Sequence, residues 1–303
     1  MPLSSGPHPG DLIPLAPRVS LLVAMHRGNF PNAHSVLVEG PETVLIDTGA
    51  GIDLLRPLAR EGRVDLVLNT HTHPDHAAGN FLFAGREILV PEAGLASAGR
   101  KDALSVRLAE PGSLAEYWKE FVTRDMGFED QPPTGSFADG QEIKAGGVRL
   151  QVIATPGHTA DHCCFFLPEQ GILLSADIDL TSFGPWYGHR ESDLAEFRRS
   201  IALVKALKPR LLVSSHRPPL DHGIDEALDA FLAVFERREA RLLNYLREPR
   251  SREQIVEASL IYGGFPRIPR LLRYWEGQMA DKHLAELMER GLVRSGERGF
   301  LAV

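Results

Sequence analysis

The chain has 303 residues, enough for one large domain with a small one or for two domains of medium size. Hydrophobic residues make up 43% and charged residues 24% of it, a balance typical of globular proteins in water. The net charge of −7 argues against a protein that binds nucleic acid over its whole surface. No apolar run approaches the roughly 18 residues needed to cross a bilayer, so we expect no membrane partner.

The first residues of the chain and its two cysteines indicate in which cellular compartment we expect the protein. Residues 1–15 carry no basic residue ahead of an apolar block, so we expect no secretory signal. Cys163 and Cys164 are adjacent and cannot bridge each other without unusual strain. We expect them to be two small apolar side chains of a strand in a reducing compartment, and we predict a cytoplasmic protein.

Short aliphatic and β-branched runs predict strands in the first half of the chain, at residues 19–25, 34–40 and 42–49. The near-continuous apolar run at 64–68 is typical of a strand buried on both faces. Residues near 93–125 have a helical and polar pattern, which would suit a lid over a site.

Strands resume after Gly147, and a helix at 191–207 separates the last two of them. The predicted strands cover 148–156, 163–168, 171–177 and 210–216. Two groups of strands with helices between them favour an α/β layered fold over a barrel.

The pattern changes near Asp225. Apolar residues at helical spacing predict a long helix that runs to Glu248 and stops before Pro249. Ser251 and Gln254 have the spacing of a capping box for a helix over 251–260. A further helix over 276–290 and a hairpin over 292–303 complete a pattern typical of a winged-helix-like module.

The hexapeptide at residues 71–76, HTHPDH, concentrates metal-ligand side chains. In an extended loop His71 and His73 face the same way and can hold one metal. Pro74 then forces a turn, which places Asp75 and His76 where a helix begins and where they can face a second metal. The chain has only 12 histidines, so three within six residues by accident is improbable.

HTHPDH resembles the HxHxDH signature of the metallo-β-lactamase superfamily, and the family's other motifs follow in order over residues 15–222. LIDTG at 45–49 is similar to the family's strand-end motif, and TPGHT at 155–159 places His158 at the position of a first-metal ligand. Asp177 matches the bridging carboxylate, and His216 matches the last ligand of the second metal. The resemblance implies a four-layer αββα catalytic domain over 1–224 and a helical, winged-helix-like domain over 225–303.

The resemblance also implies the role of each ligand. His71, His73 and His158 would hold the first metal, Asp75, His76 and His216 the second, and Asp177 would bridge both. Two zinc ions are the expected cofactors, although iron or manganese would suit the same ligands. Such a pair lowers the pKa of a shared water, and Asp75 would be the catalytic residue that orients it and relays its proton.

The remaining polar residues receive separate predictions. We expect Asp47 to brace the ligand loop through hydrogen bonds, and His162 to point into a strand face or a hydrogen bond. Trp186, Tyr187 and His189 follow Asp177 and would line the mouth of the pocket, with Tyr187 able to donate to an oxyanion. His222 could also reach a substrate.

Several branches of the family fit poorly. Oxygen-reducing flavodiiron proteins carry Glu at the position of His73, and antibiotic-hydrolysing enzymes usually have a different second-site set and a secretory signal. The 19 positions from His158 to Asp177 and the 39 from Asp177 to His216 leave no room for the large inserted domain of some nucleases. The helical, glutathione-binding C-terminal part of glyoxalase II suits a terminal hairpin poorly.

The remaining resemblance is to hydrolases with a winged-helix-like tail, some of which are single-strand-specific endoribonucleases. Arginines at 250, 252, 267, 270 and 273 hint at phosphates, but a solvated helix face explains them as well. We therefore predict a hydrolase acting on a small-molecule ester, thioester or lactone. The alternatives are an RNA-cleaving phosphodiesterase and a mononuclear iron persulfide dioxygenase, and the latter is disfavoured because all second-site ligands are present.

Overall fold

The computed structural model describes residues 6–303, so the first residues of the predicted catalytic domain and of the 1–15 stretch lie outside the description. The first sheet has seven strands in chain order. They are β1 (Leu12–Ala16), β2 (Val19–Leu22), β3 (Ser35–Val38), β4 (Val44–Ile46), β5 (Leu66–Leu68), β6 (Glu87–Pro91) and β7 (Gly135–Phe137). Pairing is antiparallel as far as β4 and parallel from β4 to β7.

The second sheet has five strands in the order β12-β11-β10-β9-β8. Its members are β8 (Glu142–Ala145), β9 (Val148–Ala154), β10 (Cys163–Leu167), β11 (Ile172–Ala176) and β12 (Leu211–Ser214). Strands β11 and β12 are parallel, and the other neighbours are antiparallel. Cys163 and Cys164 are free and buried on β10, as predicted.

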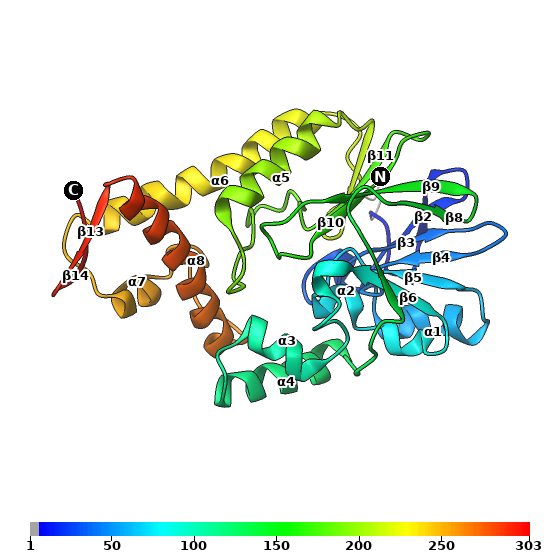
Figure 1. The fold of residues 1–303 in the computed structure, drawn as a ribbon, viewed down its shortest axis with the longest axis horizontal. Helices are drawn as coiled ribbons and strands as arrows, with labels where there is room; N and C mark the ends of the chain where they lie inside the picture. The colour runs from blue at the N-terminus through cyan, green and yellow to red at the C-terminus, as the bar shows by residue number, and fades with distance from the viewer. Residues whose placement is uncertain (1–5) are drawn as a thin grey trace, which may run out of the picture.

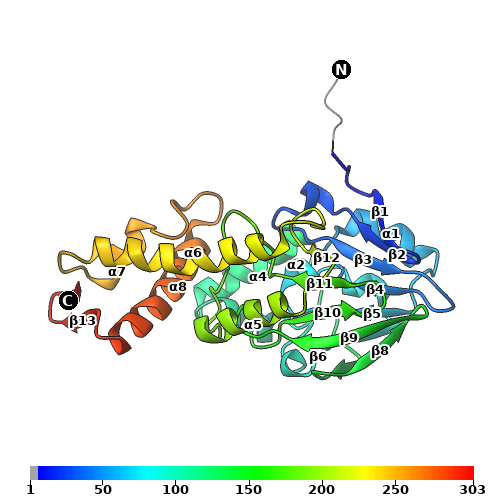
Figure 2. The same ribbon diagram turned by 90° about the horizontal axis from the view of Figure 1, so that it is seen from above.

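The two sheets face each other across the main apolar core, to which side chains such as Ile46, Leu68, Phe165 and Val213 contribute. Helix α1 (Ile52–Arg60) packs through Leu55 on the other face of the first sheet. Helices α5 (Leu194–Ala206) and α6 (Ile224–Tyr245) cover the other face of the second sheet. The predicted four-layer αββα arrangement is therefore confirmed (Figures 1 and 2).

Parallel pairing brings the functional loops to one edge. Strands β4 and β5 run in the same direction, so Asp47 and the segment from Asn69 follow them at the same end of the first sheet. Strands β11 and β12 do the same in the second sheet for Asp177 and His216. The facing ends of the two sheets thus carry all four segments, in line with the tendency of α/β folds to bind ligands beyond the carboxyl ends of their strands.

The region predicted as a helical lid contains two helices, α3 (Lys101–Leu108) and α4 (Ser113–Met126). They are less polar than expected, because Trp118, Phe121 and Val122 of α4 are buried in a second apolar core. Short helical turns η1 (Met25–Gly28), α2 (Pro74–Ala77), η2 (Asn80–Phe83) and η3 (Glu92–Gly94) connect the remaining strands.

The C-terminal segment consists of α6, α7 (Arg252–Ala258), α8 (Pro269–Glu289) and the hairpin of β13 (Val293–Gly296) with β14 (Gly299–Ala302). The predicted capping box at Ser251 and the terminal hairpin are confirmed. Helix α6 ends at Tyr245, slightly before the predicted Glu248. Helix α8 begins well before residue 276, because Pro269 occupies its first turn, where a missing N–H costs nothing.

Helices α6 and α8 each reach from the hairpin back to the layered part of the molecule (Figures 1 and 2). Leu228, Phe231 and Phe235 of α6 pack with α5 and the second sheet, whereas Leu242 packs in a separate C-terminal core. The start of α8 packs on α3 and α4 through Leu271 and Trp275. The division of the chain into two domains after residue 224 stays a prediction.

Within residues 6–303, no helix combines the length and apolarity that a membrane crossing requires.

Candidate active site

The ligand loop follows β5, a short strand with three buried residues. His73 has extended backbone angles (φ −63°, ψ 144°) and precedes Pro74, which starts α2. Asp75 and His76 therefore lie on the first turn of a helix, as the sequence predicted. The loop is packed closely on Gly49, where a Cβ would approach the backbone oxygen of Asp75 to 1.8 Å, so only glycine fits there.

The structure brings His71, His73, His158 and Asp177 together. The Nδ1 atom of His73 lies 2.9 Å from Nε2 of His71 and 3.0 Å from Nε2 of His158. Oδ2 of Asp177 lies 3.2 Å from His158 Nε2 and 3.9 Å from His71 Nε2. Four potential ligand atoms thus converge within 4.8 Å of one another, the geometry of a group that can hold one metal ion.

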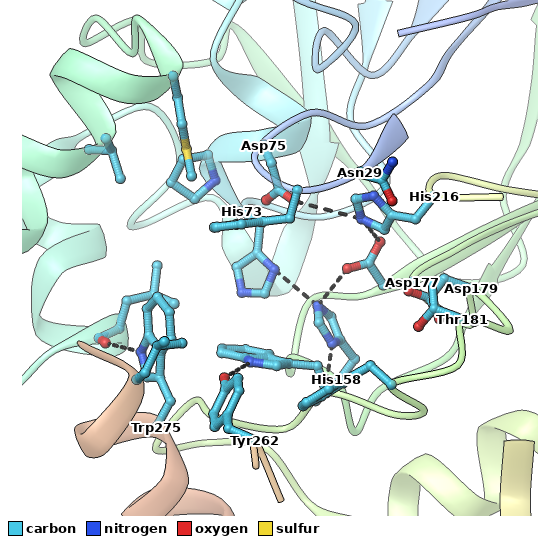
Figure 3. Close-up of a pocket in the computed structure, with 18 of the residues that line it drawn as sticks. Asn29, His73, Asp75, His158, Asp177, Asp179, Thr181, His216, Tyr262 and Trp275 are labelled. Atoms are coloured by element: carbon cyan, nitrogen blue, oxygen red, sulfur yellow. Dashed lines mark hydrogen bonds and ion pairs between the residues drawn. The ribbon is translucent and has the colours of Figure 1, made fainter. Parts of the chain in front are cut away.

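A second group consists of Asp75, His76 and His216. Oδ2 of Asp75 lies 3.9 Å from Nε2 of His76 and 3.7 Å from Nε2 of His216. The other carboxylate oxygen of Asp177, Oδ1, faces this group at 3.0 Å from His76 and 3.4 Å from His216. Asp177 therefore directs one oxygen to each group, as the predicted bridging role requires (Figure 3).

Two observations indicate that these residues suit cations. His76 Nε2 and Asp177 Oδ1 are buried, and neither makes a hydrogen bond among residues 6–303, although they lie 3.0 Å apart. Two unsatisfied ligand atoms facing one point are expected where an ion belongs. In addition, burial lowers the pKa of His71 and His73 well below the usual range and that of His158 to about 3, which keeps these imidazoles neutral and able to coordinate.

The second group has a different charge state without an ion. Burial alone would lower the pKa of His76 and His216, but the facing carboxylates, Asp177 foremost, raise it well above the usual range in His76 and to about 9 in His216. Burial would raise the pKa of Asp177, but His76 and His216 bring it well below the usual range. The carboxylates thus attract positive charge to this place, and a metal ion would supply it in place of protons.

An apolar cavity of about 400 Å³ opens over both groups. His73, Asp75, His158, Asp177 and His216 form its polar floor (Figure 3). Its walls are mainly aromatic and aliphatic side chains, from Phe30, Leu108, Trp118, Phe121, Val122, Met126, Phe183, Trp186, Tyr262, Leu272 and Trp275. A concave apolar site of this size with a few convergent polar groups is typical of a small-molecule pocket.

Comparison with known proteins places the chain. The model of the metallo-beta-lactamase superfamily matches residues 28–216. This chain belongs to that superfamily. It is 24% identical over 298 residues to the "Beta-lactamase-like protein 2 homolog" of Drosophila melanogaster, covering 93% of each protein. It is 26% identical over 277 residues to an "Atrochrysone carboxyl ACP thioesterase" of Aspergillus fumigatus, covering 86% of this chain and 74% of that protein.

Solved structures agree with the assignment. A metallo-beta-lactamase family protein from Thermus thermophilus has a TM-score of 0.74 at 26% identity, over 96% of this chain and 100% of the other. A beta-lactamase domain protein from Burkholderia ambifaria has the same fold, with a TM-score of 0.72 at 18% identity, over 99% and 96% of the two chains. The protein is accordingly a metal-binding hydrolase of the metallo-β-lactamase superfamily.

In His76, His158 and His216, the ring nitrogen that does not face the ligand group contacts an oxygen atom of the protein. Nδ1 of His158 lies 2.8 Å from the carbonyl oxygen of Trp186, and Nδ1 of His216 lies 2.6 Å from that of Gly28. Nδ1 of His76 lies 2.8 Å from Oδ2 of Asp47. Asp47 also accepts hydrogen bonds from the backbone N–H and the hydroxyl of Thr70, so its predicted bracing role is confirmed. Such partners orient a ligand and set which nitrogen faces the metal.

His162 makes hydrogen bonds, as predicted, and they brace the site. Its Nδ1 lies 2.8 Å from the hydroxyl oxygen of Thr155. Its Nε2 accepts a hydrogen bond of 3.1 Å from the backbone N–H of Asp177. His162 therefore positions the shared carboxylate and does not face the cavity floor itself.

The expectation that His189 lines the pocket mouth is wrong. His189 is fully buried, and its Nε2 lies 2.7 Å from Nε2 of His73, behind the cavity floor. Its Nδ1 lies 3.2 Å from Glu191, which in turn pairs with Arg107. Arg107 also donates to Asp161, which accepts the backbone N–H of Thr72. This chain of polar groups, buried at His189 and Asp161 and partly exposed at Arg107 and Glu191, fixes His73, and no pattern in the sequence indicated it.

The expectation for Tyr187 is also wrong, whereas that for Trp186 holds. Trp186 lines the cavity and packs against the rings of His73 and His158, at centroid distances of 5.4 and 5.5 Å. Tyr187 is absent from the cavity lining and packs against Phe235 of α6 and His283 of α8. Its hydroxyl lies 2.7 Å from His283 Nε2 and accepts a hydrogen bond from Arg238. It cannot donate to a substrate oxyanion from there.

His222 lies outside the cavity as well. Its side chain is 89% exposed and pairs with the neighbouring Asp221 at 2.6 Å. The suggestion that it reaches a substrate is therefore wrong. Asp179, which the sequence analysis did not single out, does line the cavity, and burial raises its pKa to about 6.

Proposed function

We propose that the protein hydrolyses an ester, thioester or lactone of an apolar small molecule with the help of two metal ions. The observation that carries the proposal is the position of Asp177, whose two oxygens face two separate ligand groups at the floor of an apolar cavity. Zinc is the expected metal, with iron or manganese as alternatives for these nitrogen and oxygen ligands. The two free, buried cysteines support a cytoplasmic location.

In this proposal each group of residues has one task. His71, His73 and His158 hold the first metal, Asp75, His76 and His216 hold the second, and Asp177 contacts both. When bound, such a pair activates water at neutral pH and polarises an acyl oxygen. Asp75 holds the proton of the attacking water and delivers it to the leaving atom. The apolar walls seat the acyl group and exclude bulk water from it.

The names of relatives support the choice of an acyl substrate. A relative from Aspergillus fumigatus and another from Emericella nidulans both carry the name "Atrochrysone carboxyl ACP thioesterase". The second matches only 56% of this chain, at 29% identity. A thioester is therefore the first substrate class to test.

Two alternatives remain as outcomes of the test. RNA cleavage would need free cations near the cavity, but Arg252 pairs with Asp281 and Arg273 pairs with Glu257. Arg270 donates to Ser113 and lies over the ring of Tyr117, 5.1 Å from its centroid. Persulfide oxidation by a single iron would need only one ligand group. The three residues of the second group nevertheless lie together as a set that could hold a metal ion.

The test combines metal analysis with a substrate panel. Protein purified without added metal is analysed for metal content and then assayed, after loading with zinc, iron or manganese, on thioesters, lactones, phosphodiesters and RNA. We expect two metals per chain and turnover of an apolar thioester or ester, with Asp177→Asn losing metal and activity together. One metal per chain with oxygen-dependent persulfide turnover, or cleavage of RNA alone, would contradict the proposal.

A further inference from the structure

One wall of the cavity comes from the C-terminal segment. Leu272 and Trp275 of α8 and Tyr262 from the loop before it line the cavity, although the superfamily model matches only residues 28–216. Figure 3 shows Trp275 and Tyr262 across the pocket from Asp75 and His216. The adjoining wall comes from Trp118 and Phe121 of α4, on which the start of α8 packs.

Hydrogen bonds brace this wall, and they already use its indole N–H groups. The indole N–H of Trp275 donates to the carbonyl oxygen of Leu108 at 2.7 Å. The indole N–H of Trp186 donates to the hydroxyl oxygen of Tyr262 at 2.7 Å. The backbone N–H groups of Ile261 and Tyr262 donate to the buried carboxylate of Glu276, each at 3.0 Å. The two indoles therefore present ring faces and edges to a ligand, and these polar contacts hold them in place.

The position of the wall relative to the floor indicates what it binds. His and Asp side chains of the two ligand groups form the floor of the cavity, so the reacting carbonyl of a substrate must lie there. Everything beyond the floor in the direction of α4 and α8 is mainly apolar, so the group attached to that carbonyl is desolvated there. Apolar burial favours larger groups by about fourfold in affinity for each added methylene.

We propose that the C-terminal segment is the acyl-binding element of the enzyme and that the protein selects a large apolar acyl group, seated against the walls that α4 and α8 form. The catalytic part of this statement rests on the proposed function, whereas the binding part does not. The segment thus has a small-molecule task in place of the nucleic-acid contact that winged-helix-like tails suggest.

The binding part is tested with straight-chain carboxylates, the products of acyl hydrolysis, on the metal-loaded full chain. Butanoate, hexanoate, octanoate and decanoate are titrated by calorimetry. The carboxylate contributes equally across the series, so the slope of affinity against chain length reports the cavity. We expect about fourfold tighter binding per methylene until the cavity is full. All three tryptophans of the chain, at positions 118, 186 and 275, line the cavity, so their fluorescence should change in step with binding.

Variants of Leu272 test whether the alkyl chain of the ligand lies next to α8. Leu272→Trp narrows the cavity and should weaken decanoate binding at least tenfold while leaving butanoate within twofold. Leu272→Ala widens it and should move the best chain length upward. Met288→Ala is the matched control, because Met288 is an apolar residue of the same helix that is 38% exposed and outside the cavity, and it should behave as the parent protein.

The outcomes separate the two proposals. Affinity independent of chain length, or a slope that Leu272→Trp leaves unchanged, would overturn the acyl-binding inference even if esters are hydrolysed. A steep slope that Leu272→Trp removes, with no turnover of any ester or thioester, would uphold the inference and overturn the proposed function.

Discussion

The buried Arg238 of α6 offers a sharp test of how the C-terminal segment supports the site. Arg238 is 4% exposed and donates to the carbonyl oxygens of Phe183 and Pro185, at 2.7 and 2.5 Å, and to the hydroxyl oxygen of Tyr187 at 2.9 Å. These contacts hold the loop that carries Trp186. In Arg238→Met the aliphatic stem remains, but three acceptors lose their donor.

The magnitude follows from those contacts. Each buried acceptor left without a partner costs about 1–3 kcal/mol. Part of this is offset because the guanidinium no longer has to be desolvated. We therefore expect a net loss of about 2–4 kcal/mol in the free energy of unfolding. For a chain of 303 residues that corresponds to a decrease of roughly 3–6 °C in Tm.

The same variant should weaken metal binding. The carbonyl oxygen of Trp186 faces Nδ1 of His158, and loss of such a ligand-orienting partner typically costs about 10- to 100-fold in metal affinity or activity. Thermal unfolding and metal titration are measured beside Arg237→Met, which removes an exposed arginine from the adjacent position of α6. If Arg238→Met is as stable as Arg237→Met and binds metal equally well, the contacts carry no weight and the reasoning fails.

Three further predictions concern the ligands and the charge network. Asp75→Asn keeps an oxygen ligand and should retain metal while turnover falls by about 10² or more, whereas His71→Ala should lose metal as well; full activity of Asp75→Asn with both metals bound would rule out its role. Chelation should lower Tm and metal should restore it, because an ion that binds only the folded state at 1,000 times its Kd stabilises it by about 4 kcal/mol; an unchanged Tm on complete metal removal counts against the ligand set. The pKa of Glu239 is lowered to about 2, mainly by contact with His283 and Arg290. The ionised carboxylate therefore stabilises the folded state above pH 4.5, and this stabilisation is lost as the pH falls towards 2. Glu239→Gln should therefore be less stable than the parent at pH 7, with a difference that narrows below pH 4.5, and a difference independent of pH between 7 and 2 would show that the charge of Glu239 is not its source.

The ligand loop could be predicted from the sequence because its geometry is local. His71 and His73 share a direction in an extended segment, and Pro74 starts a helix, whatever the rest of the chain does. The strands were predictable for a similar reason, since β5 and β11 are short apolar runs between turn residues. The positions of His158, Asp177 and His216 followed from resemblance alone, because no local rule joins residues so far apart.

The substrate-side residues could not be predicted in this way. Trp186 and Tyr187 are adjacent aromatic residues, and nothing in the sequence says which of them faces the cavity. Their partners decide it: Tyr187 meets Arg238 and His283, which lie 51 and 96 residues further along the chain. His189 is similar, since its contact with His73 spans 116 residues. A prediction from neighbours in sequence fails where the deciding contact is tertiary.

The C-terminal arginines show why charge composition misleads about partners. Counted in the sequence, they suggest a surface for phosphates. In the structure Arg252 and Arg273 are paired with carboxylates of the same segment, and such exposed pairs leave little positive potential for a polyanion. The uncharged residues of that segment are the ones that enter the cavity, at Tyr262, Leu272 and Trp275. Two of the segment's arginines are thus compensated by carboxylates, whereas its aromatic residues line an apolar cavity, which favours an apolar ligand over a polyanion. Under the proposed function, the C-terminal segment would bind the acyl group of the substrate on whose carbonyl the metal site acts.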